Sequence, residues 1–199
     1  NTEATGVAVS LDVAGTMKGD AEGSSVSDAS VTATSTATGI EGGEGDDTID
    51  NEGLYNLVSD AEGDTAATTG TIAGTVVKKG VAGADVDVTA LSKASSTAEA
   101  ITVGLDGDEG NDTITNMNDI EQLNAEADSD TVAVSLGVDV VLTTKGASDV
   151  DLEGVALSDA SATAAAVVTG LDAGDGDDTL VNEGDLIDLE TYAKSNSDA

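Results

Sequence analysis

Apolar side chains recur at every second residue along much of this chain. The pattern is clearest over residues 7–13 and 132–140, where Val and Leu alternate with small or polar residues. Residues 84–104 and 150–170 alternate for about twenty positions with little turn punctuation. Alternation with period two, together with many β-branched residues, predicts β-strands, and no segment sustains the 3.6-residue period of a helix. We therefore expect an all-β protein with very little helix.

A glycine-aspartate loop occurs three times in the same register. The loops begin at Gly39, Gly104 and Gly170, so their spacings are 104 − 39 = 65 and 170 − 104 = 66. A Ser-x-Ala-Ser marker precedes each loop at a constant offset. Seams rich in Asp and Ser follow the first two loops. These features divide the chain into three repeats, at residues 1–64, 65–130 and 131–199.

Two arrangements of such repeats are compatible with the pattern. The first is a parallel β-solenoid, like a β-helix or β-roll, of three repeats of about 65 residues, because small residues suit a narrow interior between stacked coils. The run Thr-Ile-x-Asn of the first two loops, which is Thr-Leu-Val-Asn in the third, then predicts a corner in which Asn and the following Gly tolerate a left-handed turn. The alternative is a row of small β-sandwich domains, since the alternating runs exceed usual strand lengths and the polar seams resemble linkers.

Composition limits both the core and the partners. Leu, Ile and Val total 43 of 199 residues and Phe and Trp are absent, so the core must be thin. Forty acidic residues against six lysines give a net charge of −34, which disfavours nucleic acid and anionic membranes and favours cations. No apolar run is long enough for membrane insertion. Because residue 1 is Asn, we expect a processed or excised piece of a longer chain.

The loops suggest metal binding rather than catalysis. Carboxylates on a glycine-rich turn, where backbone carbonyls can converge, form an oxygen-only cage that suits Ca²⁺. The chain has no His, Cys or Arg, which removes the commonest general base and every thiolate, and we expect no enzyme activity. The simpler interpretation is a set of polar turns capped by Asp and Asn. Recurrence in register favours calcium.

The sequence from Gly42 to Ile49, Gly-Gly-Glu-Gly-Asp-Asp-Thr-Ile, resembles the nonapeptide of repeats-in-toxin, or hemolysin-type, calcium-binding proteins. The second and third copies each replace one of the first two glycines. The resemblance implies that the turn carbonyls and one aspartate per loop bind calcium, and that an apolar residue enters the core of a β-roll. The implied aspartates are Asp47, Asp112 and Asp178, and the implied core residues are Ile49, Ile114 and Leu180.

One departure from that family concerns the second half of each site. The family stacks its nonapeptides in tandem and shares each ion between successive coils, whereas here each copy stands alone in the sequence. We therefore expect further acids of the same loop to complete each site. These are Asp46, Glu44 and Glu41 in the first loop, Asp108, Glu109 and Asp106 in the second, and Asp177, Asp175 and Asp172 in the third.

Long repeats with one such motif resemble those of very large, acidic bacterial surface proteins, including adhesins. The resemblance implies a secreted, calcium-stabilised structural repeat at the cell surface, such as a segment of a fibre, sheath, surface layer or adhesin stalk. Such a protein would join neighbouring repeats or self-associate. The alternative is an adhesive module in which calcium organises a site for carbohydrate or for a partner surface.

Overall fold

The protein is all-β in the computed structural model, which describes residues 1–16, 21–53, 56–77, 82–143, 148–186 and 188–199. Those residues contain no helix, and so none that could cross a membrane. The strands of the described chain are β1 (Thr2–Thr16), β2 (Ala21–Glu41), β3 (Thr48–Asn51), β4 (Asn56–Val77), β5 (Ala82–Asp106), β6 (Thr113–Asn116), β7 (Gln122–Thr143), β8 (Ser148–Asp172), β9 (Thr179–Asn182) and β10 (Leu189–Asp198).

Every sheet takes strands from successive repeats. Sheet A has the order β1-β4-β7-β10, sheet B the order β2-β5-β8, and the short third sheet the order β3-β6-β9, and all pairs are parallel. Residues one repeat apart lie opposite each other on hydrogen-bonded strands, as in Ile49 beside Ile114 and Ile114 beside Leu180. The alternative of tandem sandwich domains expects strands of one repeat to pair with each other, and this pairing joins different repeats instead.

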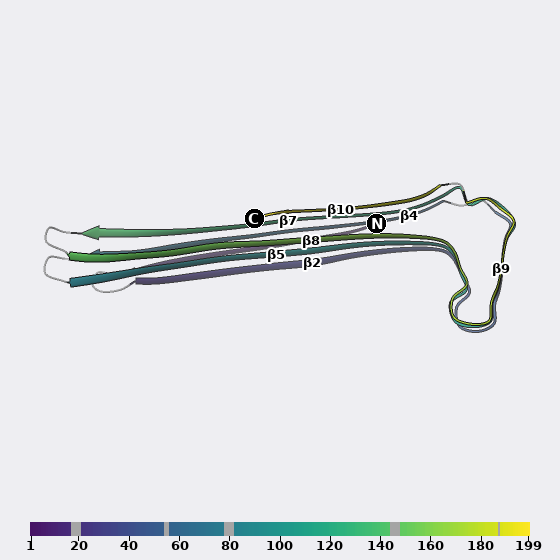
Figure 1. Ribbon diagram of the computed structural model, residues 1–199, viewed down its shortest axis with the longest axis horizontal. Coiled ribbons are helices and arrows are strands. Elements are labelled where there is room, and N and C mark those ends of the chain that lie inside the picture. Colours follow the sequence, from purple (N-terminus) through teal and green to yellow (C-terminus); the bar gives the residue numbers. More distant parts are fainter. Residues whose placement is uncertain (17–20, 54–55, 78–81, 144–147, 187) are drawn as a thin grey trace.

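The molecule is a flat rod with a hook at one end. Sheets A and B lie face to face along the rod, and the third sheet forms the outer side of the hook (Figure 1). We call the strands that one repeat adds to the three sheets a layer. Strands β5 and β8 have 25 residues each, well beyond the usual length of about 3–10. The divisions expected at 64/65 and 130/131 fall inside β4 and β7, and the polar seams are strand.

Small side chains fill the space between sheets A and B. The buried cluster at its centre consists of alanines, among them Ala33, Ala98 and Ala127. The two backbones approach closely at Gly63, where an added Cβ would lie 3.1 Å from the carbonyl oxygen of Thr97, so the position favours glycine. Several buried hydroxyl groups bind one another or a carbonyl, and Ser96 Oγ lies 2.5 Å from Ser129 Oγ, whereas Ser27 Oγ is buried without a partner. The expectation of a thin core with small inward residues is confirmed.

Large apolar side chains point outward from the same strands. On β1, residues Val7, Val9, Leu11 and Val13 are 67–75% exposed, while the alternate residues face sheet B. The inward residues of this strand are small, among them Ala8 and Ala14, so sheet B lies close to it. On β5, by contrast, Val86 and Val88 point inward and pack with Ala14. Alternation therefore predicted the strands correctly, but residue size alone does not tell which face lies inside.

Candidate cation site in the stacked glycine-aspartate loops

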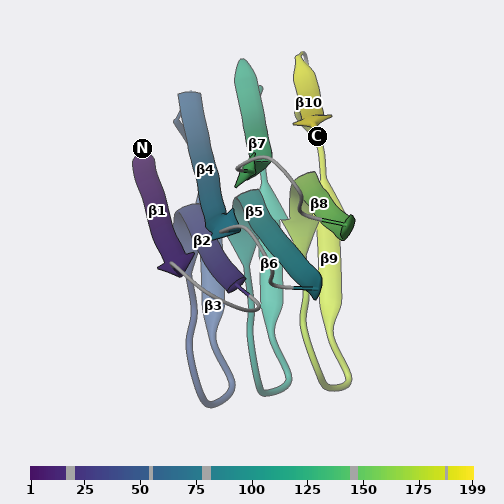
Figure 2. The same ribbon diagram turned by 90° about the vertical axis from the view of Figure 1, so that its left-hand side faces the viewer.

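The three loops lie on top of one another in the hook, between the end of sheet B and the third sheet. Figure 2 shows them side by side, one from each repeat. Backbone hydrogen bonds join them, from Gly42 N to Asp106 O (2.8 Å) and from Gly107 N to Asp172 O (2.9 Å). Residues one repeat apart therefore lie next to each other, although their loops are far apart in the sequence. That acids of the same loop complete each site stays a prediction.

Glycine is required by the close stacking of these turns. Gly45, Gly110 and Gly176 have positive φ angles of 119°, 153° and 154°. An added Cβ on Gly110 would lie 1.8 Å from the carbonyl oxygen of Gly45 in the preceding layer. Such contacts leave no space for a side chain. The glycine spacing in the sequence therefore reflects both the turn conformation and the contact between layers.

The aspartates implied by the family resemblance form a column through the hook. Asp112 Oδ1 accepts a hydrogen bond from the backbone N of Asp47 (2.8 Å), and Asp178 Oδ1 accepts one from the N of Asp112 (2.8 Å). The Oδ1 atoms of Asp112 and Asp178 are thus each bound to the preceding layer. The Oδ2 atoms of Asp47 and Asp112, by contrast, are buried and have no hydrogen-bond partner. Asp112 is only 1% exposed.

The free oxygen of Asp112 faces a carbonyl oxygen of the next layer across a glycine. A Cβ added to Gly107 would lie 2.7 Å from Asp112 Oδ2 and 2.4 Å from the carbonyl oxygen of Ala173. These two oxygens are therefore at most 2.4 + 2.7 = 5.1 Å apart. Two oxygens bound to one Ca²⁺ at about 2.3–2.6 Å can be separated by up to about 5 Å. The two oxygens are thus close enough to bind the same ion.

The same arrangement recurs one layer earlier. A Cβ on Gly42 would lie 2.9 Å from the carbonyl oxygen of Gly107 and 3.4 Å from Asp47 Oδ2. Within the described residues, no group of three or more Asp, Glu, His or Cys side chains could hold a metal ion. A cation between layers would therefore depend on backbone carbonyl oxygens together with one aspartate oxygen, as the turn chemistry predicts.

A second column of residues lies on the solvent side of the loops. Asp46 Oδ1 accepts hydrogen bonds from both the backbone N (2.9 Å) and the side-chain Nδ2 (3.0 Å) of Asn111. Asn111 Oδ1 in turn accepts one from the backbone N of Asp177 (2.9 Å). The neutral amide of Asn111 thus separates two carboxylates and donates to one of them. These exposed residues connect the layers without a cation.

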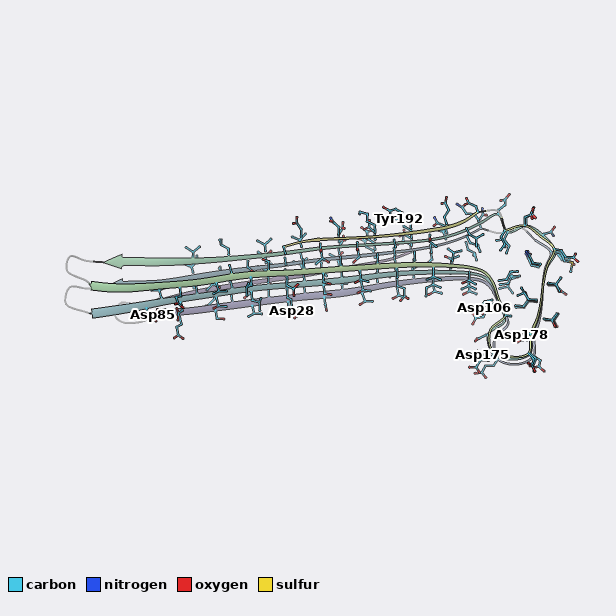
Figure 3. All side chains as sticks on the ribbon, viewed as in Figure 1. Asp28, Asp85, Asp106, Asp175, Asp178 and Tyr192 are labelled. Atoms are coloured by element: carbon cyan, nitrogen blue, oxygen red, sulfur yellow. The ribbon has the colours of Figure 1, made fainter. Side chains whose placement is uncertain are left out.

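The remaining predicted acids lie along the outside of the hook. Glu41, Asp106 and Asp172 pair in register at the ends of sheet B, and Glu44, Glu109 and Asp175 form bridges at the loop tips. A surface pocket of about 400 Å³ lies between the second and third layers, and Figure 3 shows the carboxylates of this hooked end. Its lining residues are Asp106, Asp108, Glu109, Asp172, Gly174 and Asp175.

In this outer pocket carboxylates repel one another, and one residue, Asp108, has a strained backbone conformation. Burial raises the pKa of the Asp106 carboxyl, and the nearby carboxylates of Asp172 and Asp108 add to the effect. Asp108 has a positive φ of 71°, a conformation that Gly43 and Gly174 adopt in the other layers. Unlike Asp112, these acids do not provide a buried oxygen without a partner. The outer pocket therefore concentrates negative charge, whereas the buried carboxylate oxygens without a partner belong to the aspartate column.

Core residues at the hook follow the expectation in two layers. Ile49 and Ile114 are 5% and 0% exposed and pack with Leu105. Leu180 is 46% exposed, because it belongs to the last layer and no further layer covers it. The prediction of a core role is therefore confirmed for the two isoleucines and wrong for Leu180 in this chain.

Sequence reasoning missed an asparagine ladder beside the loops. Asn51 Nδ2 donates to Asn116 Oδ1 (2.6 Å), and Asn116 Nδ2 donates to Asn182 Oδ1 (2.7 Å). Only Asp108 among the described non-glycine residues has a positive φ, so the left-handed turn expected at these asparagines is wrong. The three asparagines stand at the same distance from the first glycine of their loops, and this constant offset could have indicated that they stack. An amide can donate to one layer and accept from the next, which stacking favours.

Another concentration of negative charge covers part of the outer face of sheet A. We call this set the acidic block; it consists of Glu3, Asp60, Glu62, Asp64, Glu126, Asp128 and Asp130. The neighbouring Asp64 carboxylate, more than any other cause, raises the pKa of Glu62. Burial, followed by the carboxylates of Asp130 and Asp128, raises the pKa of Asp64. Lys194 on β10 forms an ion pair with Asp128 (2.8 Å) at the edge of the block.

These raised pKa values predict that mild acidification stabilises the protein in chelator. A carboxyl whose pKa is higher in the folded state contributes stability that is fully present below its unfolded value, 4.5 for Glu62 and 3.8 for Asp64, and is lost as pH rises through the folded value. The melting temperature should therefore rise as pH falls from neutrality toward 4.5. Differential scanning calorimetry at fixed salt measures it. Glu62→Gln should flatten the dependence more than Glu22→Gln on sheet B, and equal slopes would contradict the assignment.

Comparisons with protein-family models, with curated proteins and with solved structures find no match to this chain.

Proposed function

We propose that this chain is a calcium-stabilised segment of a β-solenoid that serves an extracellular structural protein, such as a fibre, sheath, surface layer or adhesin stalk, without catalysis. The observation that carries the proposal is the free Oδ2 of Asp112, which is buried and faces the carbonyl oxygen of Ala173 across the side-chain-free Gly107. A buried carboxylate oxygen without a partner is costly, and a cation between the layers offsets that cost.

Calcium suits the available atoms better than other common ions do. The candidate positions offer only oxygen, from carboxylates and backbone carbonyls, which favours a hard cation over zinc or copper. Mg²⁺ demands a near-ideal octahedron at about 2.0–2.1 Å and loses its water reluctantly, whereas Ca²⁺ accepts irregular cages with longer bonds. The chain's net charge of −34 also favours any arrangement that binds divalent cations.

The stacking of the loops supports the resemblance to repeats-in-toxin proteins, because it supplies the neighbouring turn that the sequence lacked. Asp47 and Asp112 would each bind an ion together with carbonyl oxygens of their own and the next layer. Asp178 has no further layer to complete its position. We therefore propose two ions shared between the three layers, with further binding at a terminal layer only where another coil covers it.

A structural role agrees with the shape of the molecule. Parallel layers joined through continuous backbone hydrogen bonding form a stiff, extended object whose length grows with the number of repeats. Calcium at each junction of the hooks would connect one layer to the next and neutralise the column of aspartates. Secretion to the cell surface fits this proposal, because calcium sites of moderate affinity fill at extracellular concentrations.

A calcium titration tests the proposal. Adding Ca²⁺ to chelator-treated protein should raise the melting temperature, since an ion that binds only the folded state stabilises it by about 2.7 kcal/mol at one hundred times its Kd. Circular dichroism follows unfolding, and calorimetry should report two ions per chain. Mg²⁺ at the same ionic strength should have a much smaller effect. An unchanged melting temperature across millimolar Ca²⁺ would rule the proposal out.

A further inference from the structure

An exposed apolar face covers the half of sheet A that lies away from the hook. Parallel pairing aligns its outward residues into four columns across β1, β4 and β7. Nine of these residues are large and apolar, with exposed fractions between 36% and 75%. We call this set the apolar face; its columns are Val7, Ala66 and Val132; Val9, Thr68 and Val134; Leu11, Gly70 and Leu136; and Val13, Ile72 and Val138.

The apolar face is comparable in size with the largest apolar patch of a typical monomer, about 300–600 Å², and such patches are often functional. Its columns are two residues apart along the strands, about 6.7 Å, and its strands are about 4.8 Å apart. Four columns on three strands therefore cover a footprint of about 400 Å², which reaches the size at which apolar patches on soluble proteins become interaction sites. The packing of the two sheets does not account for these side chains, because the interior is filled by the alternate residues.

Charge on the same sheet limits what can cover the apolar face. The acidic block occupies the next three columns toward the hook. The outer face of sheet A is therefore apolar at one end and strongly negative at the other. On sheet B, by contrast, one apolar column lies next to a charged column. The apolar column consists of Val26, Leu91 and Leu157, and the charged column of Asp28, Lys93 and Asp159. Sheet B therefore lacks a continuous apolar surface of this kind.

We propose that the apolar face pairs with the apolar face of a second copy of this chain, with the two rods antiparallel. A two-fold axis that lies in the plane of the interface and runs across the strands places the apolar halves against each other. It also directs the acidic blocks and hooks of the two copies in opposite directions, which keeps their like charges apart. A parallel arrangement would oppose the two acidic blocks directly, and repulsion between carboxylates would disfavour it.

The size of the contact predicts a weak association for three repeats. Two footprints of about 400 Å² remain below the roughly 1,200 Å² of a standard specific interface. Each further repeat adds one strand to sheet A, and so one residue to each column of the apolar face, and the affinity should therefore rise with the number of repeats. Salt should also strengthen pairing, because it screens the net charge of −34 while leaving the apolar contact intact. The inference concerns sheet A and is independent of the calcium proposal.

Sedimentation equilibrium across NaCl concentrations, at constant calcium, tests the pairing. A monomer-dimer equilibrium should shift toward dimer as salt rises. The double variant Val9→Thr, Leu136→Thr should raise the dimer Kd about tenfold, because it removes apolar area while retaining strand propensity. The matched pair Val155→Thr, Leu157→Thr on the outer face of sheet B should change it less than about twofold. A strict monomer at every salt concentration would overturn the proposal, as would equal effects of the two variants.

Cysteine crosslinking gives a second readout that does not depend on removing the contact. The chain has no cysteine, so a single introduced thiol reports on one position. Thr68→Cys lies within the apolar face and Thr89→Cys lies on the outer face of sheet B. Under mild oxidation, Thr68→Cys should form a covalent dimer at concentrations where Thr89→Cys remains monomeric. Equal yields from the two variants would show that the apolar face is not the interface.

Discussion

Replacing Asp112 by Asn should make the protein more stable in chelator and less stable than the parent in calcium. Asn keeps an oxygen that can accept the hydrogen bond from the backbone N of Asp47. It removes a buried negative charge, and its amide can donate toward the carbonyl oxygen of Ala173, which the free Oδ2 cannot do. Relieving an unpaired buried polar atom is worth about 1–3 kcal/mol, so the free energy of unfolding in chelator should rise by about that amount.

The same substitution should remove the gain from calcium at the second junction. A neutral amide is a poorer calcium ligand than a carboxylate, so calorimetry should count one ion fewer and the calcium-induced rise in melting temperature should shrink. Asp46→Asn is the matched control, because Asp46 is exposed and its Oδ1 already accepts hydrogen bonds from Asn111. That variant should leave the ion count unchanged. A full calcium response in Asp112→Asn would exclude Asp112 as a ligand.

Replacing Asn116 by Ala should destabilise the protein strongly whether or not calcium is present. Asn116 is fully buried at the centre of the asparagine ladder and forms hydrogen bonds with both Asn51 and Asn182. Its loss leaves the buried side-chain donor of Asn51 unpaired and removes the hydrogen bond to Asn182, whose exposed acceptor can bind water instead. A buried orphaned group costs about 1–3 kcal/mol and a lost hydrogen bond about 1 kcal/mol, so we expect a loss of about 2–4 kcal/mol in the free energy of unfolding.

Asn182→Ala provides the control for the ladder. Asn182 is exposed in the last layer and makes one ladder contact, so its removal should cost about 1 kcal/mol. Urea unfolding followed by circular dichroism, with chelator and with calcium, measures both variants. Equal midpoints for the two variants would contradict the greater contribution of the buried position, and midpoints equal to that of the parent would show that the ladder adds little to stability. A loss that appears only in calcium would instead connect Asn116 to the cation site.

Much of the local structure can be predicted from the sequence. Alternation with period two identifies the strands, because successive side chains on a strand point to opposite faces. The nearly constant spacing of the three loops reappears in the pairing of Ile49 with Ile114 and of Ile114 with Leu180. The all-β class, the small inward residues and the oxygen chemistry of the loops also follow from residue type alone.

Only the tertiary structure decided which groups meet. Alternation cannot say which face is inside, and on β1 the close spacing of the sheets selects the small residues, so that Val9 and Leu11 lie outside. Loops that stand alone in the sequence stack in space, which brings the carbonyl of Ala173 to Asp112. Of two adjacent acids with the same residue type, Asp46 is satisfied in solvent by Asn111, and Asp47 retains a buried free oxygen. These differences arise from contacts between layers, which no local pattern encodes.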